Sequence, residues 1–231
     1  MKVIVPLAGP DFVKPDGSVK AEIPVEGLPL LRRALESRSW WTSDLVTDAD
    51  LVFVLHDNPP SRRFAENTLS QWYPAARQVF LSTYTRGAAL TAAAGCALLS
   101  DMHEAICLDL TDILFDCEID PKALFDQPHT GALALTFPSD KPVYSYLRRN
   151  AAGEVVETAE KRVISSEASA GVYFFRSTAV YLKALAHIMD HEAAYTHRNL
   201  FFVCPVLNGV LPQGLGIEGI PVSNIRDIKV D

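Results

Sequence analysis

The sequence predicts an α/β fold in which the strands form a mostly parallel central sheet. Two features of its first half lead to this prediction. Short apolar runs alternate with segments of helical periodicity, and this order is typical of a doubly wound sheet. One apolar run, residues 105–108, leads directly into acidic residues and has the continuous hydrophobicity of a strand buried on both faces. At 231 residues the chain is long enough for one substantial core, with room for a small additional lobe.

In the first half, the elements follow from local signals. A stretch rich in Pro, Gly and charge, residues 11–27, indicates a loop after the first strand. The segment 29–37 has Pro in its first turn and apolar residues on one face, which favours a helix. Small residues throughout 87–99 predict a helix that approaches the sheet closely. We therefore predict strands over 2–7, 51–55, 78–81 and 105–108, and helices over 29–37, 61–72 and 87–99.

In the second half, the pattern changes to period-two alternation and turns, which predicts a small antiparallel lobe. Ser177 is suited to cap a helix over 178–188, and Pro205 is expected to kink a helix over 198–209. The other predicted elements are strands over 132–137, 143–148, 154–157, 170–175 and 217–222, a turn over 150–153, and an extended piece over 225–231. No segment resembles a linker, so residues 1–231 are expected to form a single Rossmann-like three-layer domain.

Composition restricts the partners and the compartment. The formal net charge of −7 argues against binding to nucleic acid through phosphate neutralisation. No apolar run approaches the length of a membrane span, and the amino end lacks the features of a secretory signal. The four cysteines have no C-x-x-C spacing, and two of them, Cys96 and Cys107, lie in apolar surroundings, which is compatible with a reducing cytoplasm. We therefore expect a cytoplasmic protein without a membrane partner.

Acidic residues follow the predicted central strand. Asp109, Asp112 and Asp116 come at or beyond its carboxyl end, where open α/β sheets bind their ligands. Carboxylates at such a place are suited to hold Mg²⁺ together with the phosphates of a substrate. The alternative is that they only end the strand and form turns, a common role of aspartate.

Seven short motifs follow one another along the chain, and their order as well as their residues are informative. They are VIVPLAG at 3–9, KAEIPVEGLPLL at 20–31, RGAALT at 86–91, LTDILF at 110–115, EK at 160–161 with SAGVYFF at 169–175, NLFFVCPVLN at 199–208, and RDI at 226–228. Together they resemble the sugar-phosphate nucleotidyltransferases, a family with a glycosyltransferase-A-like fold. The stretch at 199–208 is similar to members encoded with capsule or surface-polysaccharide pathways.

The resemblance implies an enzyme that transfers a nucleotidyl group from a nucleoside triphosphate to a sugar phosphate or another phosphorylated small molecule, releases pyrophosphate, and uses Mg²⁺ as cofactor. It places nucleotide binding in residues 1–120 and acceptor binding in 121–231, and it is compatible with a homo-oligomer. The implied residues are Lys20 and Lys14 for catalysis, Asp112 and Asp227 for the metal, Leu7, Ala8, Gly9, Arg86 and Gly87 for the nucleotide, and Glu160, Lys161 and Gly171 for the acceptor.

The glycine-rich loop departs from the family pattern. The family has G-x-G-T/S-R, whereas this chain has Gly9-Pro10-Asp11-Phe12 and no arginine. Pro10 also removes a backbone donor. Two other functions therefore stay open: a non-catalytic protein that binds a nucleotide or a sugar, and a glycosyltransferase that uses a nucleotide sugar. A D-x-D motif would favour the latter, but Asp109 and Asp112 are spaced one residue too widely.

Overall fold

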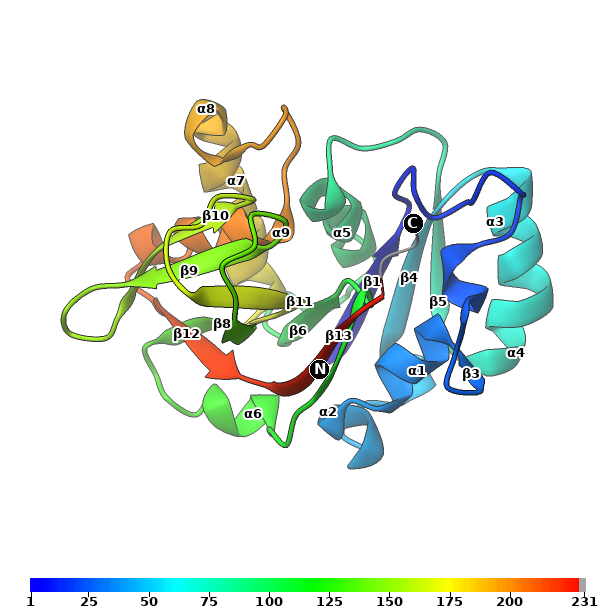
Figure 1. Cartoon of the computed structure of the whole chain (residues 1–231), viewed down its shortest axis with the longest axis horizontal. Coiled ribbons are helices and arrows are strands. Elements are labelled where there is room, and N and C mark those ends of the chain that lie inside the picture. Colours follow the sequence, from blue (N-terminus) through cyan, green and yellow to red (C-terminus); the bar gives the residue numbers. More distant parts are fainter. Residues whose placement is uncertain (229–231) are drawn as a thin grey trace.

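The computed structural model describes residues 1–228, and its central element is a twisted sheet with helices on both faces (Figure 1). Four parallel strands form its first half in the order β6-β1-β4-β5. Their bounds are Lys2–Leu7 for β1, Leu51–His56 for β4, Arg77–Leu81 for β5 and Ile106–Asp109 for β6. The predicted parallel sheet is thus confirmed, with each boundary within two residues of the prediction.

Two hydrophobic cores cover the two faces of this sheet, because alternate residues of each strand point to opposite sides. On β1, Val3 and Val5 join one core while Ile4 joins the other. The first core is covered by α1 (Leu30–Glu36), α2 (Ser39–Thr42), α3 (Pro59–Phe64) and α4 (Ser70–Trp72), with a π-helical turn, Ala65–Leu69, joining α3 to α4.

Helix α5 (Ala88–Cys96) covers the second core, and its small residues allow the close approach that the sequence predicts. A Cβ atom added at Gly95 would lie 2.8 Å from Ile4 Cγ2 on β1, closer than packed carbon atoms permit. This core also receives α7 (Thr178–Asp190), which begins after Ser177 as predicted, with the Ser177 hydroxyl accepting a hydrogen bond from the Val180 amide.

The second half adds antiparallel strands to the same sheet (Figure 1). Strand β11 (Glu167–Phe175) lies antiparallel to β6 and also pairs with β8 (Thr130–Pro138) and β9 (Ser145–Arg149). This half also contains β10 (Val155–Glu160), α6 (Pro121–Leu124), α8 (Glu192–Tyr195), α9 (Val203–Val206) and β12 (Gly216–Pro221). Among residues 1–228, no helix has both the length and the apolar character needed to cross a membrane.

Two short pairings that the sequence analysis missed lie beside the main sheet. Strands β2 (Pro24–Val25) and β3 (Leu28–Pro29) form a hairpin within the predicted loop. Strand β7 (Ile113–Asp116) pairs with β13 (Ser223–Asp227) in antiparallel fashion. The predicted extended piece over 225–231 is therefore observed as a strand as far as Asp227, and its last three residues lie outside the described part of the chain.

The predicted helix over 198–209 is wrong in its first half. Arg198 and Asn199 have φ values of 50° and 64°, which a right-handed helix excludes. Helical structure begins only with α9 and continues in a 3-10 turn, Leu207–Gly209. Pro205 therefore stands in the first turn of a short helix, where its missing amide hydrogen costs little.

Candidate functional site

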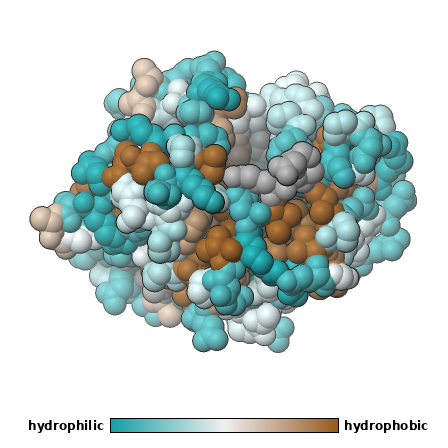
Figure 2. Space-filling model, in the orientation of Figure 1, coloured by the Kyte–Doolittle hydropathy of each residue, from teal (hydrophilic) through white to brown (hydrophobic). Residues whose placement is uncertain are grey.

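Two adjoining cavities lie beyond the carboxyl ends of β1 and β6, where ligands of open α/β sheets bind. The first has a volume of about 530 Å³ and the second about 840 Å³. Residues that line both cavities are Pro10, Asp11, Lys20, Leu110, Asp112, Lys161 and Phe202. Figure 2 shows hydrophobic side chains gathered on both sides of the polar band where β13 crosses this face of the molecule.

The first cavity contains four of the residues expected to bind a nucleotide. Leu7, Ala8 and Gly9 line it from the end of β1, and Gly87 lines it from the start of α5. Its net charge is low, because the charged side chains among its described lining residues are two lysines, Lys20 and Lys161, and two aspartates, Asp11 and Asp112. Such a largely apolar wall is suited to the flat ring of a base.

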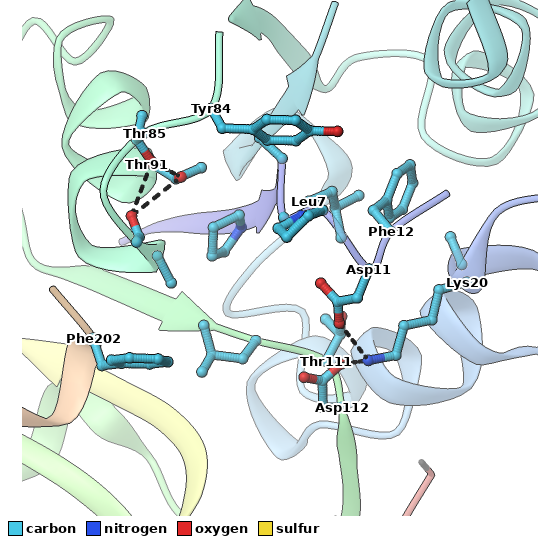
Figure 3. Close-up of a pocket in the computed structure, with 18 of the residues that line it drawn as sticks. Leu7, Asp11, Phe12, Lys20, Tyr84, Thr85, Thr91, Thr111, Asp112 and Phe202 are labelled. Atoms are coloured by element: carbon cyan, nitrogen blue, oxygen red, sulfur yellow. Dashed lines mark hydrogen bonds and ion pairs between the residues drawn. The ribbon is translucent and has the colours of Figure 1, made fainter. Parts of the chain in front are cut away.

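Polar and aromatic residues that the sequence analysis missed also line this cavity (Figure 3). The ring of Tyr84 is stacked on His56 with a distance of 4.1 Å between ring centres. The hydroxyls of Thr85 and Thr91 lie 2.7 Å apart, and Thr85 also donates to the Gly87 carbonyl. These residues give the cavity a fixed aromatic edge and a pair of hydroxyls opposite the loop that follows β1.

Lys20 and Asp112 meet in the wall between the two cavities (Figure 3). Lys20 Nζ lies 2.7 Å from Asp112 Oδ1 and 3.5 Å from Asp11 Oδ2. Burial alone would lower the pKa of Lys20, but the ion pairs with Asp112 and Asp11 outweigh burial and raise the pKa. The ammonium group is therefore charged and lies between two carboxylates.

The Asp112 carboxyl has a raised pKa because the surrounding protein removes water from it. The ion pair with Lys20 opposes this rise, whereas the negative charges of Asp11 and Asp227 add to it. A positive charge placed beside these carboxylates would relieve their repulsion. Three carboxylates thus lie near one another with the ammonium group of Lys20 as the positive charge beside them. Such an arrangement favours the binding of a cation.

Asp227 reaches the second cavity through the pairing of β13 with β7. The amide of Ile228 donates to the Asp112 carbonyl at 3.1 Å, so the segments carrying the two aspartates are joined next to their side chains. The hydroxyl of Tyr144 donates to Asp227 Oδ2 at 2.8 Å. Within residues 1–228 no group of three or more His, Cys, Asp or Glu side chains could hold a metal ion. Two carboxylates suit Mg²⁺ only together with water and substrate phosphate oxygens.

The second cavity contains the three residues expected to bind the acceptor. The side chain of Glu160 is only 8% exposed and accepts a hydrogen bond from the Ser145 hydroxyl. Burial raises the pKa of Glu160, although Ser145 and Lys161 both favour the ionised form. Lys161 Nζ lies 3.5 Å from Glu160 Oε1, and Gly171 adopts a φ of 77° in the same wall. Lys161 lines the first cavity as well, so it is not confined to the acceptor side.

Lys14 and Arg86 differ in position from the other predicted residues. Lys14 lines the second cavity but not the first, and its Nζ lies 3.7 Å from Asp16 Oδ2. Arg86 does not line either cavity among the described residues. Its guanidinium group instead binds Glu192 and Asn199.

Asp109, the first of the three acidic residues after the central strand, has a structural role. Its side chain and that of Arg38 are both 0% exposed, and two hydrogen bonds of 2.9 and 3.2 Å join them. Asp109 Oδ1 also accepts from the Thr111 amide, and Arg38 donates to the Ile113 carbonyl. The pair therefore fixes both ends of the loop that carries Asp112. Asp116, the third acidic residue, instead accepts from the Asn224 side chain.

No protein-family model and no curated protein sequence matches the chain. Solved structures do. A nucleoside-diphosphate-sugar pyrophosphorylase from Vibrio cholerae RC9 has a TM-score of 0.80 at 20% identity, covering 96% of this chain and 93% of that one. A putative glucose-1-phosphate thymidylyltransferase from Bacillus anthracis, in complex with a sucrose, has a TM-score of 0.73 at 16% identity, with coverages of 98% and 89%.

A UDP-glucose pyrophosphorylase complexed with UDP-glucose has a TM-score of 0.70 at 16% identity, covering 98% of this chain and 92% of that one. All three similarities extend over nearly the whole length of both proteins. The α/β architecture, the parallel first half and the antiparallel strands of the second half are thus a shared arrangement. The chain has the fold of the sugar nucleotidyltransferases.

Proposed function

We propose that this protein transfers a nucleotidyl group from a nucleoside triphosphate to a sugar phosphate or another phosphorylated small molecule and releases pyrophosphate. The observation that carries the proposal is the Lys20–Asp112 pair in a wall shared by two cavities. In this assignment the first cavity, which we call the nucleotide cavity, holds the base and ribose. The second, the acceptor cavity, holds the phosphorylated acceptor. The reacting phosphates then lie beside the shared wall.

The reaction requires positioning and charge neutralisation more than covalent help from the protein. A phosphate oxygen of the acceptor attacks the α-phosphorus in line, the bond to the bridging oxygen breaks, and pyrophosphate leaves with the electron pair. Lys20, freed from Asp112, would lie next to the negative charge of the reacting phosphates. Asp112 and Asp227 would hold Mg²⁺, which when bound supplies the positive charge that orients and stabilises the phosphate oxygens.

The proposal is tested by incubating the protein with each nucleoside triphosphate, Mg²⁺ and a panel of sugar phosphates while pyrophosphate release is measured. One base and one acceptor class should give turnover well above the others, and EDTA should abolish it. Absence of pyrophosphate release with every combination would contradict the proposal.

Lys20 should matter more than Lys14 for triphosphate binding, because only Lys20 lines the nucleotide cavity. Replacing Lys20 by Ala leaves Asp11 and Asp112 unpaired, and their charges then repel the triphosphate. We expect Lys20→Ala to raise the dissociation constant of the Mg²⁺–triphosphate complex at least tenfold, roughly 1.4 kcal/mol. Titration calorimetry measures this, with exposed Lys183 on α7 changed to Ala as the control. A larger loss in Lys14→Ala than in Lys20→Ala would reverse the assignment.

Lys161 lines both cavities, so its replacement should affect both substrates. We expect Lys161→Ala to raise the KM of the acceptor more than that of the triphosphate, because its ammonium group is paired with Glu160 on the acceptor side. Steady-state kinetics with each substrate varied in turn gives the two values. Equal increases would show that Lys161 does not favour the acceptor.

The altered loop supports a second candidate function. Asp11 occupies the loop where the resembled family has phosphate-binding residues, and its carboxylate lies 3.5 Å from Lys20. Because no arginine follows Gly9, the loop provides no bidentate grip on a phosphate. A protein that only binds a nucleotide or a nucleotide sugar would fit this loop. Calorimetric binding of a nucleotide sugar without any pyrophosphate release would favour that function.

A further inference from the structure

Residues 197–202, which we call the 197–202 turn, belong to the second half of the chain and contact the start of α5 in the first half. Two backbone hydrogen bonds of 3.1 and 3.0 Å pair His197 with Leu200. Arg198 and Asn199 between them have φ values of 50° and 64°, as in the tight turns of β-hairpins. The turn therefore has a defined conformation.

Backbone contacts attach this turn to the first half of the protein. The Phe201 amide donates to the Arg86 carbonyl at 2.7 Å, and the Ala89 amide donates to the Phe201 carbonyl at 3.1 Å. Gly87 lies between these two bonds with a φ of 109°, and a Cβ atom there would stand 2.4 Å from the Phe201 oxygen. Only glycine permits this approach, so a glycine is required at position 87 for the contact with the turn as well as for the cavity wall.

The side chain of Arg86 binds the turn from outside the cavities. Its guanidinium group donates to both carboxylate oxygens of Glu192, at 2.5 and 3.1 Å. It also donates to the Asn199 carbonyl from two nitrogens, each at 3.2 Å, and to the Asn199 side chain. The guanidinium carbon lies 5.1 Å from the centre of the Phe201 ring. A planar group with several fixed donors is needed for this set of contacts, and lysine lacks it.

The turn places two apolar side chains against the proposed substrates. Leu200 lines the nucleotide cavity, and Phe202 lines both cavities (Figure 3). Lys161 Nζ lies 5.7 Å from the centre of the Phe202 ring. The position of the turn thus decides the shape of the boundary between the two cavities.

We propose that Arg86 is a positioning residue: it latches the 197–202 turn and thereby holds Leu200 and Phe202 in the walls of the two cavities. The inference rests on the proposed function for the identity of the two ligands. With the latch intact, the Phe202 ring keeps its place in the wall that the two cavities share. Without the latch, the turn is still held through Phe201, by its two backbone bonds and its buried ring, but Leu200 and Phe202 are held less firmly in the cavity walls.

The chain offers a matched control for this latch. Arg62 forms an equally exposed bidentate pair with Asp57, at 2.7 and 2.9 Å, and its guanidinium carbon lies 3.8 Å from the Phe80 ring. Among the residues that the structure describes, neither Arg62 nor Asp57 is part of the wall of either of these two cavities. Arg62→Ala therefore removes the same kind of contact without moving a cavity wall.

The first arm of the experiment is amide hydrogen exchange, which reports local opening and does not depend on turnover. We expect Arg86→Ala to speed exchange at the amides of Phe201 and Ala89 at least tenfold and to leave the central strands unchanged. Glu192→Gln, which weakens the latch from its outer side, should give a smaller increase. Arg62→Ala should have no effect on this segment. Unchanged exchange in Arg86→Ala would overturn the latch.

The second arm is kinetic. Arg86→Ala should raise the KM of both substrates at least fivefold while kcat changes less than twofold, and Arg86→Lys should not restore the KM values. A fall in kcat with both KM values unchanged would overturn the positioning role. If the wild-type protein releases no pyrophosphate with any substrate pair, the proposed function fails, and the exchange arm alone still decides whether Arg86 latches the turn.

Discussion

Asp112→Asn is expected to lower kcat/KM for pyrophosphate release by two to three orders of magnitude, about 3–4 kcal/mol of transition-state stabilisation, while the fold stays intact. The amide keeps the shape of the carboxylate but not its charge. Without that charge, the side chain at position 112 attracts a divalent cation far less strongly, so the cation is no longer held between it and Asp227. The dependence of the residual rate on Mg²⁺ concentration should also become weaker, which a titration of the metal measures.

A suitable control is Asp116→Asn. Asp116 is an exposed carboxylate at the end of β7, four residues further along, and it contacts Asn224 rather than Lys20. Its variant should keep the activity and the Mg²⁺ dependence of the wild type. If Asp112→Asn retained both as well, Asp112 would have no part in the reaction.

Arg38→Met should destabilise the protein by about 3–5 kcal/mol, because it leaves the Asp109 carboxylate without its partner in the core. It also removes the donor to the Ile113 carbonyl and the stacking on Phe115, whose ring centre lies 3.8 Å from the guanidinium carbon. Urea unfolding measures the loss. By comparison, removing the exposed Arg62–Asp57 pair should cost less than about 1 kcal/mol.

A double variant separates the cost of an unpaired charge from the value of the pair itself. Arg38→Met combined with Asp109→Leu removes both charges and should recover part of the stability lost in Arg38→Met. The double variant should nevertheless lose activity, because Asp109 no longer accepts from the Thr111 amide and the loop carrying Asp112 is released. A double variant as unstable as the single one would show that the buried charge is not the source of the loss.

Much of the fold could be predicted because local pattern and tertiary structure agree. The apolar runs became β1, β4 and β6, and Ser177 caps α7 as its side chain allows. Strand β7 could not be predicted in the same way, because its partner β13 comes from the other end of the chain. Four residues without alternation carry no sign of such a distant pairing.

The candidate site shows the same division. Lys20, Asp112 and Asp227 could be found because they stand within stretches that resemble known motifs, and the structure brings them to adjoining cavity walls. Tyr84 stands outside these stretches, and Phe202, although it lies within the stretch at 199–208, is not among the residues that the resemblance implies for the site. Phe202 in particular was placed within a helix, since nothing in the residue pattern indicated that Arg198 and Asn199 adopt positive φ.

Strand β11 has a consequence for how this protein can be recombined with its structural relatives. It comes from the second half of the sequence, yet it forms an edge-to-edge pairing with β6 of the first half and with β8 and β9 of its own. In a chimera joined near residue 120, β6 from one parent would therefore have to pair with β11 from the other, although the two strands come from different proteins. Exchange of substrate specificity is better attempted by transplanting single loops around the cavities, so that β11 and the strands that pair with it all come from one parent.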